Sequence, residues 1–504
     1  MKITFIDPTQ SVINYGLRAL SQYLINANHE VKMIFMNQSS IQYDYDYPES
    51  IFEDLYEIVK DADIIGISFV SNYLGHSKSI TKKIKDKFDK PIIWGGIHAI
   101  AAPEQSLEVA DMVCVGEGEE CMLSLLEKME TGGNLREVPN LWFKEEDTVV
   151  CNPTAHINPN IDDYSLPLYD NTREFVRQGN NIVPMEDSIR KQIIGVTTNY
   201  YDIEEKNTYP YLTLASRGCP NICSYCCNNL FRRIYKGKGK IIRRRSNTEI
   251  ISELEKIARL MPYINVIEFF DDDFCFTDEE TISEFARLYK QKINLPFRCN
   301  FRPESVTYEK LSLLSNAGLI SVEMGLQSAS ARINRLFKRH FNKTSFMEAA
   351  RVINKFEHIV PHYDIIVDNP FENYEDIKQT LRFISELPSP YRLAVYSLTF
   401  FPGTQLYAYA KENNLIEDEI KEIISKKNYV QHEFKQPYIK LLLLYVRRVG
   451  FKRSVTRGIF LILTNRLMMM IFDSFLFYPF WFIILYTKRV FSKIQHKEIQ
   501  VIPS

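Results

Sequence analysis

The sequence predicts an α/β protein built from a Rossmann-like N-terminal domain, a partial TIM-type (β/α)6 barrel and a helical C-terminal tail. Two observations predict this class. Short apolar runs alternate with amphipathic stretches along most of the 504 residues, as in parallel strands joined by helices. The composition is globular, with 45% hydrophobic and 25% charged residues, and the length suits about three domains. The expected divisions are a first domain, a linker, a barrel and a tail, at residues 1–145, 146–208, 209–430 and 431–504.

The first domain is expected to hold five buried strands separated by helices. Strands are predicted at 3–6, 31–35, 63–68, 91–94 and 112–115, and residues 16–26 have the spacing of a helix with one apolar face. Ligands of such sheets bind beyond the carboxyl ends of the strands. Small residues follow several of these strands, and glycine lets the backbone approach a flat ligand. The candidate ligand-binding residues are Ser68, Gly95, Gly96, Gly116 and Gly118.

The middle of the chain changes pattern twice. Residues 146–208 show little periodicity and contain several Pro turns, so we expect a linker between two domains. The strand-then-helix pattern then returns, and six such units predict an incomplete barrel whose functional loops lie at the carboxyl ends of its strands. Its strands are expected at 211–214, 266–270, 297–300, 321–324, 363–367 and 393–396.

Three cysteines, Cys219, Cys223 and Cys226, follow the first barrel strand in the run Arg-Gly-Cys-Pro-Asn-Ile-Cys-Ser-Tyr-Cys. Thiolates are the usual ligands of iron–sulfur clusters. Three of them can hold three irons of a 4Fe-4S cluster and leave the fourth iron open for chemistry. A zinc site is the alternative, but it would want a fourth Cys or His at ligand spacing, and Cys227 directly adjoins Cys226. We predict that the three cysteines are metal ligands and catalytic residues.

The C-x3-C-x2-C spacing, with Tyr225 before the third cysteine, resembles the radical S-adenosylmethionine (SAM) family. The resemblance implies that SAM binds the open iron and that one electron cleaves it to a 5'-deoxyadenosyl radical. It places Tyr225 in the cofactor site, and Asp271 and Asp272, after the second barrel strand, near the SAM amino group. Gln327 stands where the family has a glutamate near the SAM ribose, and Gly403 lies in a Pro-Gly-Thr turn like the family's turn near the adenine. A capping acid and an ordinary tight turn are the alternatives for the aspartates and for Gly403.

The first 145 residues resemble the cobalamin-binding domain that precedes many radical SAM cores. The resemblance rests on the turns Gly95-Gly96-Ile97-His98 and Gly116-Glu117-Gly118-Glu119. The D-x-H-x-x-G loop, whose His ligates cobalt in many corrinoid enzymes, is absent because Asp7 is followed by Pro-Thr-Gln. Cobalamin would therefore lack that ligand, and a domain that has lost cobalamin stays an alternative. His98 is expected to be a structural turn residue. The two resemblances cover residues 1–415.

The tail is basic and apolar. Between Phe434 and Lys497 it holds twelve Lys and Arg against one acid, Asp473. Residues 467–486 are mostly apolar, and a bilayer crossing takes about 20 residues. Cations beside an anionic leaflet add to membrane binding. We expect the tail to hold the protein at the inner face of the cell membrane; a helical cap packed on the barrel is the alternative.

Together these features predict a cytoplasmic radical SAM enzyme that uses a 4Fe-4S cluster, SAM and cobalamin to methylate an unactivated carbon. The nine cysteines show no paired spacing, which favours a reducing compartment. The expected partners are a small-molecule substrate, with a lipid or isoprenoid favoured by the apolar tail, and an electron donor such as flavodoxin or ferredoxin. No nucleic acid is expected, because the basic stretch 232–245 reads as a solvated or anion-binding loop.

Three alternatives remain open at this point. The first is a radical SAM cyclase or rearrangement enzyme that uses cobalamin without methylating. The second is a radical SAM enzyme whose N-terminal domain is empty. The third is a membrane-tethered iron–sulfur binding module with no enzymatic activity.

Overall fold

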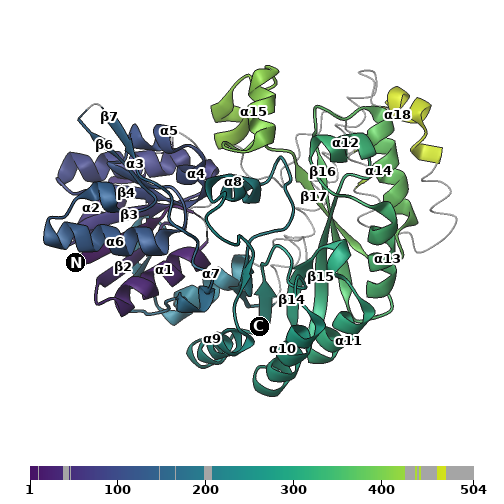
Figure 1. The fold of residues 1–504 in the computed structure, drawn as a ribbon, viewed down its shortest axis with the longest axis horizontal. Helices are drawn as coiled ribbons and strands as arrows, with labels where there is room; N and C mark the ends of the chain where they lie inside the picture. The colour runs from purple at the N-terminus through teal and green to yellow at the C-terminus, as the bar shows by residue number, and fades with distance from the viewer. Residues whose placement is uncertain are drawn as a thin grey trace, which may run out of the picture.

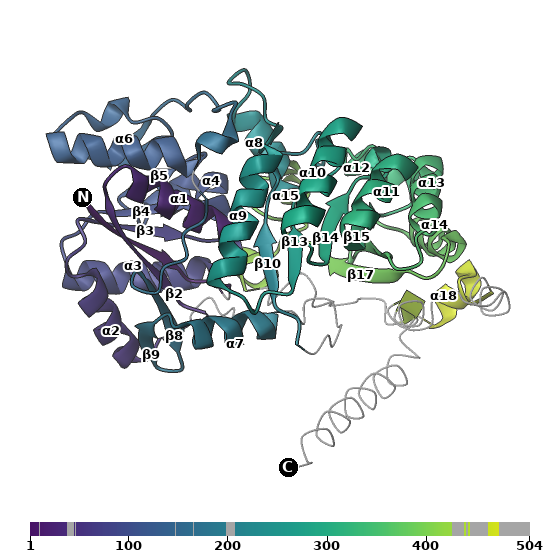
Figure 2. The ribbon, with the colours of Figure 1, turned by 90° about the horizontal axis from the view of Figure 1, so that it is seen from below.

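The computed structural model describes residues 1–9, 11–37, 45, 47–146, 148–164, 166–197, 207–425, 438–439, 442–443 and 462–472. Two sheets dominate it, one of nine strands and one of six. They lie side by side, with the first domain and the barrel forming the two halves of the molecule (Figures 1 and 2). The predicted α/β class, with two parallel-sheet domains in this order, is confirmed.

The core of the first domain is a parallel sheet in the order β5-β4-β3-β1-β2. Each strand coincides with a predicted one: β1 (Lys2–Asp7), β2 (Glu30–Phe35), β3 (Ile64–Ser68), β4 (Ile92–Gly95) and β5 (Met112–Cys114). Apolar side chains on both faces explain their continuous hydrophobic runs. One face packs against α1 (Tyr15–Asn26) and α6 (Gly118–Thr131), and the other against α2 (Glu49–Val59) and α3 (Leu74–Lys87). Short helices α4 (Gly96–Ala101) and α5 (Pro103–Leu107) follow β4.

The residues expected to be a linker instead extend this sheet at both edges. On the β5 side, β6 (Leu141–Glu145) and β7 (Thr148–Cys151) form an antiparallel hairpin. On the β2 side, β8 (Glu174–Gln178) pairs parallel with β2, and β9 (Asn181–Pro184) pairs antiparallel with β8. Helix α7 (Asp187–Thr197) follows. These strands are short and only half-buried, so they lack the apolar runs that reveal a central strand.

A buried ion pair fixes the second of these hairpins to the domain. Arg18 of α1 is fully buried and donates to Glu174 of β8 at 2.8 Å and to the carbonyl of Leu168 at 2.6 Å. Two further bonds go to the Val12 carbonyl, at 3.1 and 2.7 Å. Arg190 of α7 lies 3.4 Å from the same carboxylate. The segment after residue 146 is therefore part of the first domain's core.

The barrel is the predicted set of six parallel strands. Their order is β10-β13-β14-β15-β16-β17, the order of the sequence. The strands are β10 (Pro210–Thr213), β13 (Val266–Phe269), β14 (Phe297–Phe301), β15 (Leu319–Gln327), β16 (Val360–Val367) and β17 (Arg392–Ser397). The outer layer consists of α9 (Asn247–Leu260), α10 (Glu279–Lys292), α11 (Tyr308–Ala317), α13 (Lys343–Ile353) and α14 (Tyr374–Glu386) (Figure 1).

Smaller elements lie at the carboxyl ends of the barrel strands. A two-stranded ribbon joins β11 (Ser216–Arg217) to β12 (Arg243–Arg244), and α8 (Cys227–Ile234) lies between them in the chain. Helix α12 (Ala331–Leu336) follows β15, and α15 (Gln405–Glu412) follows β17. Figure 1 shows α8 and α15 between the two halves of the molecule. The cysteine loop, between β11 and α8, therefore lies at the carboxyl ends of the barrel strands, as predicted.

The described part of the tail packs on the barrel. Helix α18 (Arg466–Phe472) contacts α14, and Tyr438 stacks on Phe472 with ring centroids 5.1 Å apart. The Tyr438 hydroxyl donates to the Leu463 carbonyl at 2.9 Å, and Met469 is fully buried in the barrel's apolar core. Within the described ranges, no helix has the length and apolar character needed to cross a bilayer. Most of the expected crossing, residues 467–486, lies outside the described residues.

We expect Glu174→Ala to destabilise the first domain strongly. Removing one partner of a buried ion pair leaves Arg18 charged and uncompensated, which costs about 3–5 kcal/mol of unfolding free energy. Urea unfolding followed by circular dichroism measures this loss. Glu57→Ala is the matched control, because Glu57 is 73% exposed in its pair with Lys60 and such a pair is worth about 0–1 kcal/mol. Equal losses for the two variants would contradict the structural role of Glu174.

Candidate functional site

A cavity of about 490 Å³ lies between the first domain and the barrel. Its floor is formed by the carboxyl ends of β1, β3, β4 and β5, and its other wall by β11, α8 and the loop after β13. The structure places all five of the first domain's predicted ligand-binding residues in its lining: Ser68, Gly95, Gly96, Gly116 and Gly118. A site at the carboxyl ends of parallel strands is the expected place for a ligand in this fold.

Two of the glycines have different reasons to be glycine. At Gly95 the backbone is extended, and a Cβ there would meet nothing within 4 Å, so this position opens directly onto the cavity. Gly116 has a φ of +149°, and a Cβ would lie 2.4 Å from the Tyr235 hydroxyl. The first leaves room for a ligand and the second lets the barrel approach the first domain. A flat group fits the space above Gly95.

His98 has a structural role. It is buried outside the cavity lining, with Nδ1 3.1 Å from the Ser71 hydroxyl and its ring stacked on Phe69 at 5.3 Å. Burial lowers its pKa to about 4, so the imidazole is neutral at pH 7. No histidine is found among the described residues that line the cavity. The chain therefore offers a corrinoid no imidazole ligand from the described part of this surface.

The three cysteines lie on the loop between β11 and α8. Cys223 is buried, and Cys219 and Cys226 are half-buried. Burial, followed by the charges of Asp272, Cys226 and Cys223, raises the pKa of Cys219 to about 12. In the described ranges, no three His, Cys, Asp or Glu side chains gather tightly enough to hold one metal ion. Three thiolates on one loop can each bind a separate iron of a 4Fe-4S cluster.

Neighbouring elements hold this loop in place. Arg232 of α8 donates to the Cys219 carbonyl at 2.8 Å, and Ser224 donates through its backbone to Phe337 and through its side chain to Leu336. The ring of Tyr225 meets Phe337 edge-on at 4.9 Å. These bonds tie the loop to α8 and to the end of α12, so the thiols are presented on a fixed backbone.

Arg339 is a functional candidate that the sequence analysis missed. Its guanidinium lies 4.0 Å from the Cys223 sulfur and donates to the Gly325 carbonyl at the end of β15. A guanidinium in this position can pair with a carboxylate bound beside the cysteines. Its signal in the sequence was weak, because Arg339 is one of several cations in a basic stretch.

The structure separates the two predicted aspartates. Asp271 is fully buried and accepts from the Ala215 amide at 3.0 Å and from the Ser216 hydroxyl. It fixes the chain that leads into the cysteine loop and does not face the cavity. Asp272 lines the cavity and accepts from the Asn228 amide at 2.7 Å. Of the two, Asp272 has the position from which a ligand could be contacted.

Gln327 and Asp364 form a second edge of polar atoms at the barrel's carboxyl end. Gln327 ends β15 with a φ of +61°, a left-handed conformation that non-glycine residues hold only where the surroundings enforce it, often at functional sites. Its Oε1 atom is buried without a hydrogen-bond partner, as is Oδ1 of Asp364 on the adjacent strand β16. Burial and the neighbouring Glu323 raise the pKa of Asp364. Two acceptor oxygens on adjacent strands suit a ligand with neighbouring hydroxyls. In the sequence, Asp364 stood out only as an acidic residue within an apolar strand.

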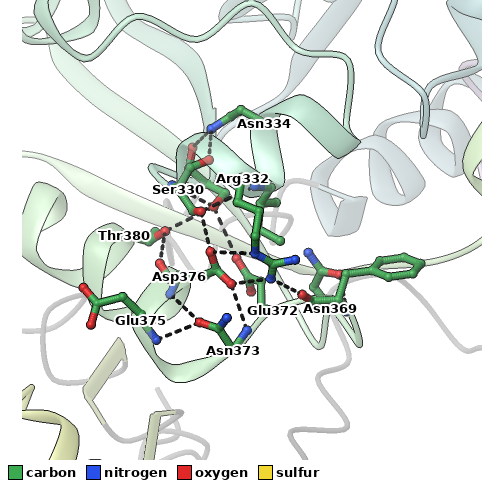
Figure 3. Close-up of polar contacts among 12 residues, drawn as sticks. Ser330, Arg332, Asn334, Asn369, Glu372, Asn373, Glu375, Asp376 and Thr380 are labelled. Atoms are coloured by element: carbon green, nitrogen blue, oxygen red, sulfur yellow. Dashed lines mark hydrogen bonds and ion pairs between the residues drawn. The ribbon is translucent and has the colours of Figure 1, made fainter.

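A polar network links the segment that follows Gln327 to the loop after β16 and to α14 (Figure 3). Ser328 donates to Glu372 at 3.2 Å, Ser330 donates to Asp376 at 2.5 Å, and Arg332 pairs with Asp376. The network joins the loop after β15 to the loop after β16 and to α14. Burial raises the pKa of Glu372 to about 8.

The turn Gly116-Glu117-Gly118-Glu119 docks the two domains together. Arg217, which directly precedes the cysteine loop, pairs with Glu119 at 2.6 Å and with Glu117 at 3.3 Å. Arg243 of β12 also pairs with Glu117, and the Glu117 amide donates to the Tyr235 hydroxyl at 2.6 Å. Burial alone would raise the pKa of Glu117, but the two arginines lower it overall. We call these four charged residues, Glu117, Glu119, Arg217 and Arg243, the domain clamp.

The clamp also accounts for part of the basic stretch 232–245. Arg243 serves the clamp, Arg244 donates to the Phe274 carbonyl at 3.1 Å, and Arg245 pairs with Glu253 at 2.7 Å. These three arginines are half-buried or buried in protein contacts and are not a solvated loop.

Gly403 lies at the boundary between the domains. Its φ is +77°, and a Cβ there would lie 2.8 Å from the Cβ of Ala101 in α4. Its carbonyl accepts from Arg233 of α8. The turn therefore packs the end of β17 against the first domain. Contact between Gly403 and an adenine stays a prediction.

Two family models match the chain. The B12 binding domain matches residues 1–126, and the Radical SAM superfamily matches residues 213–384. The first match contains the glycine-lined strand ends, and the second contains the cysteines and the edge formed by Gln327 and Asp364.

Two curated relatives each match about four fifths of this chain. An uncharacterized methyltransferase from Pyrococcus horikoshii is 25% identical over 434 residues, which is 82% of this chain and 84% of the relative. The anaerobic magnesium-protoporphyrin IX monomethyl ester cyclase of Cereibacter sphaeroides is 24% identical over 416 residues, 79% of this chain and 59% of the relative.

Solved structures share the fold. The radical SAM methyltransferase TsrM from Kitasatospora setae, with cobalamin and a [4Fe-4S] cluster bound, has a TM-score of 0.62 at 16% identity and covers 82% of this chain and 78% of its own. The cobalamin-dependent SAM radical enzyme OxsB, with aqua-cobalamin bound, has a TM-score of 0.65 at 15% identity and covers 94% and 75%.

We expect Glu372→Gln to raise the melting temperature in alkaline buffer. A carboxyl group whose pKa is raised on folding favours the folded state less as pH rises through the folded pKa, here about 8. The amide keeps an oxygen for Ser328 and does not titrate. The variant should therefore be more stable than the parent at about pH 9 and similar to it at about pH 5.

Thermal unfolding across this pH range is the measurement. Glu375→Gln is the control, since Glu375 is exposed in the first turn of α14, three residues along the chain, and its removal should leave the pH profile unchanged. A parental pH profile in Glu372→Gln would contradict the assignment.

We expect the double variant Glu117→Gln/Glu119→Gln to loosen the two domains. It leaves Arg217 and the buried Arg243 without their carboxylates, at a cost of about 3–5 kcal/mol. Limited proteolysis and urea unfolding should show separate transitions for the two domains. Glu120→Gln is the matched control, because Glu120 is the next residue on α6 and its carboxylate accepts from the Tyr23 hydroxyl, at 3.5 Å, outside the clamp. A single parental transition in the double variant would refute the clamp.

Proposed function

We propose that this chain, whose two parts match the B12 binding domain and the Radical SAM superfamily, is a cobalamin-dependent radical SAM methyltransferase acting on an unactivated carbon. One observation carries the proposal. A single cavity of about 490 Å³ is lined by the glycine-rich strand ends of the first domain and by residues of the cysteine-loop side of the barrel. A corrinoid bound to the first domain would therefore face the place where SAM is cleaved.

The cofactors supply the reaction chemistry: a 4Fe-4S cluster supplies the electron that cleaves SAM, and cobalamin supplies the methyl group. The residues of the chain bind and orient. Cys219, Cys223 and Cys226 would hold the cluster. Arg339 is placed to pair with the SAM carboxylate, because it lies beside Cys223. Asp272 is placed to accept from the SAM amino group.

The ribose of SAM would bind at the edge formed by Gln327 and Asp364. Each has a buried oxygen without a partner, and the two strands that carry them are adjacent. Vicinal hydroxyls would satisfy both acceptors. The neutral amide of Gln327 suffices for this, so the loss of the family's glutamate removes a charge and keeps the acceptor.

The substrate is a small molecule in this proposal. A lipid or isoprenoid, and attachment at an anionic membrane face, are supported by the composition of the tail alone, with its apolar segment and its twelve Lys and Arg between 434 and 497. Sedimentation of the full chain with vesicles of anionic and of neutral lipid tests the second point. Equal recovery of the protein with both kinds of vesicle would contradict attachment at an anionic membrane face.

A cyclase that uses cobalamin without methylating is the second candidate. The similarity to the protoporphyrin ester cyclase favours it, because the sequence identity to the cyclase, 24%, is close to the 25% identity to the methyltransferase relative. SAM with a deuterated methyl group separates the two. Label in the product of a turnover reaction supports methylation, and an unlabelled product supports the cyclase.

We expect the anaerobically purified chain, supplied with cobalamin and reconstituted with iron and sulfide, to form 5'-deoxyadenosine from SAM and dithionite. Cys223→Ala should abolish this product, because the cluster loses a ligand. Cys151→Ala is the control, since Cys151 lies on the exposed hairpin β6–β7. Deoxyadenosine formation by Cys223→Ala at the level of the parent would refute the cluster assignment.

We expect Gly95→Leu to weaken corrinoid binding while leaving SAM cleavage intact. The backbone at Gly95 accepts any residue, and the new side chain would project into the cavity. Overpacking costs about 1–3 kcal/mol, which is roughly 5- to 150-fold in affinity. The measurements are the corrinoid absorbance retained after gel filtration and the yield of deoxyadenosine. Unchanged corrinoid retention would place the cofactor elsewhere.

A further inference from the structure

A basic groove of about 570 Å³ lies on the outer side of the cysteine loop. The loop contributes its tip, including Asn221 and Ile222, and the segment after β15 contributes Arg335, Lys338, Arg339 and His340. No acidic residue is among the described residues that line the groove. The groove is separate from the large cavity between the domains, with which it shares no lining residue.

The charge of this groove is a feature of the sequence. Residues 324–347 hold five Lys or Arg and no Asp or Glu, although the whole chain has a net charge of −2. Arg335 and Lys338 are exposed, and no carboxylate of the described residues forms an ion pair with either. The Lys338 ammonium donates to the neutral amide of Gln405 at 2.7 Å, so its charge is retained. A concentrated positive surface of this kind attracts an acidic partner.

The groove also touches the cysteines. Arg339 lines it and lies 4.0 Å from the Cys223 sulfur, and Ile222, next to Cys223 in the chain, is 52% exposed. An exposed apolar side chain ringed by cations is typical of a surface that docks a charged protein. A protein seated here would lie against the loop that holds the cluster ligands.

We propose that this groove, through Arg335 and Lys338, is the place where the expected electron donor docks, and that the donor is an acidic one-electron carrier protein of the flavodoxin type. The inference rests on the proposed function, because reductive cleavage of SAM consumes one electron per event. The carrier's flavin hydroquinone gives up that electron and becomes the semiquinone, and the electron passes through the cysteine loop to the cluster site. Cations on the groove steer the carrier into place and set its association rate.

The test uses the double variant Arg335→Glu/Lys338→Glu in the reconstituted full chain. Neither residue belongs to the cofactor site. Binding of oxidised flavodoxin is measured by titration at low and at moderate salt. Deoxyadenosine formation is measured in parallel with reduced flavodoxin and with dithionite. Lys82→Glu/Lys290→Glu is the matched control, because it makes the same charge change at two exposed lysines on α3 and α10.

We expect the groove variant to bind flavodoxin at least about tenfold more weakly, and the parental affinity to fall as salt rises. Its turnover with flavodoxin should fall with its affinity, while its turnover with dithionite stays at the parental value. The control should match the parent in every measurement. Parental flavodoxin affinity in the groove variant, or an equal loss in the control, would overturn the proposal.

Two outcomes separate this inference from the function on which it rests. If no deoxyadenosine forms with either reductant, the proposed function fails, and the binding titration still decides whether the groove takes an acidic protein. If the groove binds a short RNA in place of flavodoxin, and the groove variant loses that binding, the groove is a nucleic-acid surface and the docking proposal is overturned.

Discussion

The domain clamp is the interaction on which the rest of the site depends. Glu117 and Glu119 lie at the end of a strand of the first domain, and Arg217 directly precedes the cysteine loop. Because these ion pairs are partly or fully buried, their geometry is held by the protein and not by solvent. The clamp therefore sets the distance between the surface that would take a corrinoid and the loop that would take an iron–sulfur cluster.

Each wall is built to tolerate a large ligand. On the first domain, Gly95 at the end of β4 leaves the space open, because a Cβ there would meet nothing within 4 Å. On the barrel, Asp271 accepts hydrogen bonds from the chain that enters the cysteine loop, and Asp272 lines the cavity. The network around Glu372 and Asp376 links the segment after Gln327 to α14 (Figure 3), and Gln327 itself has a left-handed backbone conformation. Gln327 Oε1 and Asp364 Oδ1, which have no hydrogen-bond partner in the protein, are acceptors that a ligand would satisfy.

The central strands of both sheets and the location of the site could be predicted from the sequence, because parallel strands that are buried on both faces have continuous apolar sequences. Their carboxyl ends locate the site, so the glycines and the cysteines were found. The hairpin strands β8 and β9 were missed, since β8 pairs with β2, a strand far away in the chain. Which of two adjacent aspartates faces the cavity depends on a one-residue change of direction that composition does not encode. The clamp and Arg339 depend on how separate elements dock, and no local pattern carries that information.

The central claim is that the two domains form one site in which the corrinoid faces the cluster at a fixed distance. Pulsed electron paramagnetic resonance on the fully loaded protein, between cob(II)alamin and the reduced cluster, measures that distance directly. We expect a single narrow distribution of the distance between cobalt and cluster in the parent, and a broad one when Glu117 and Glu119 are both replaced by glutamine. A broad distribution in the parent, or a narrow one that survives loss of both carboxylates, would contradict it.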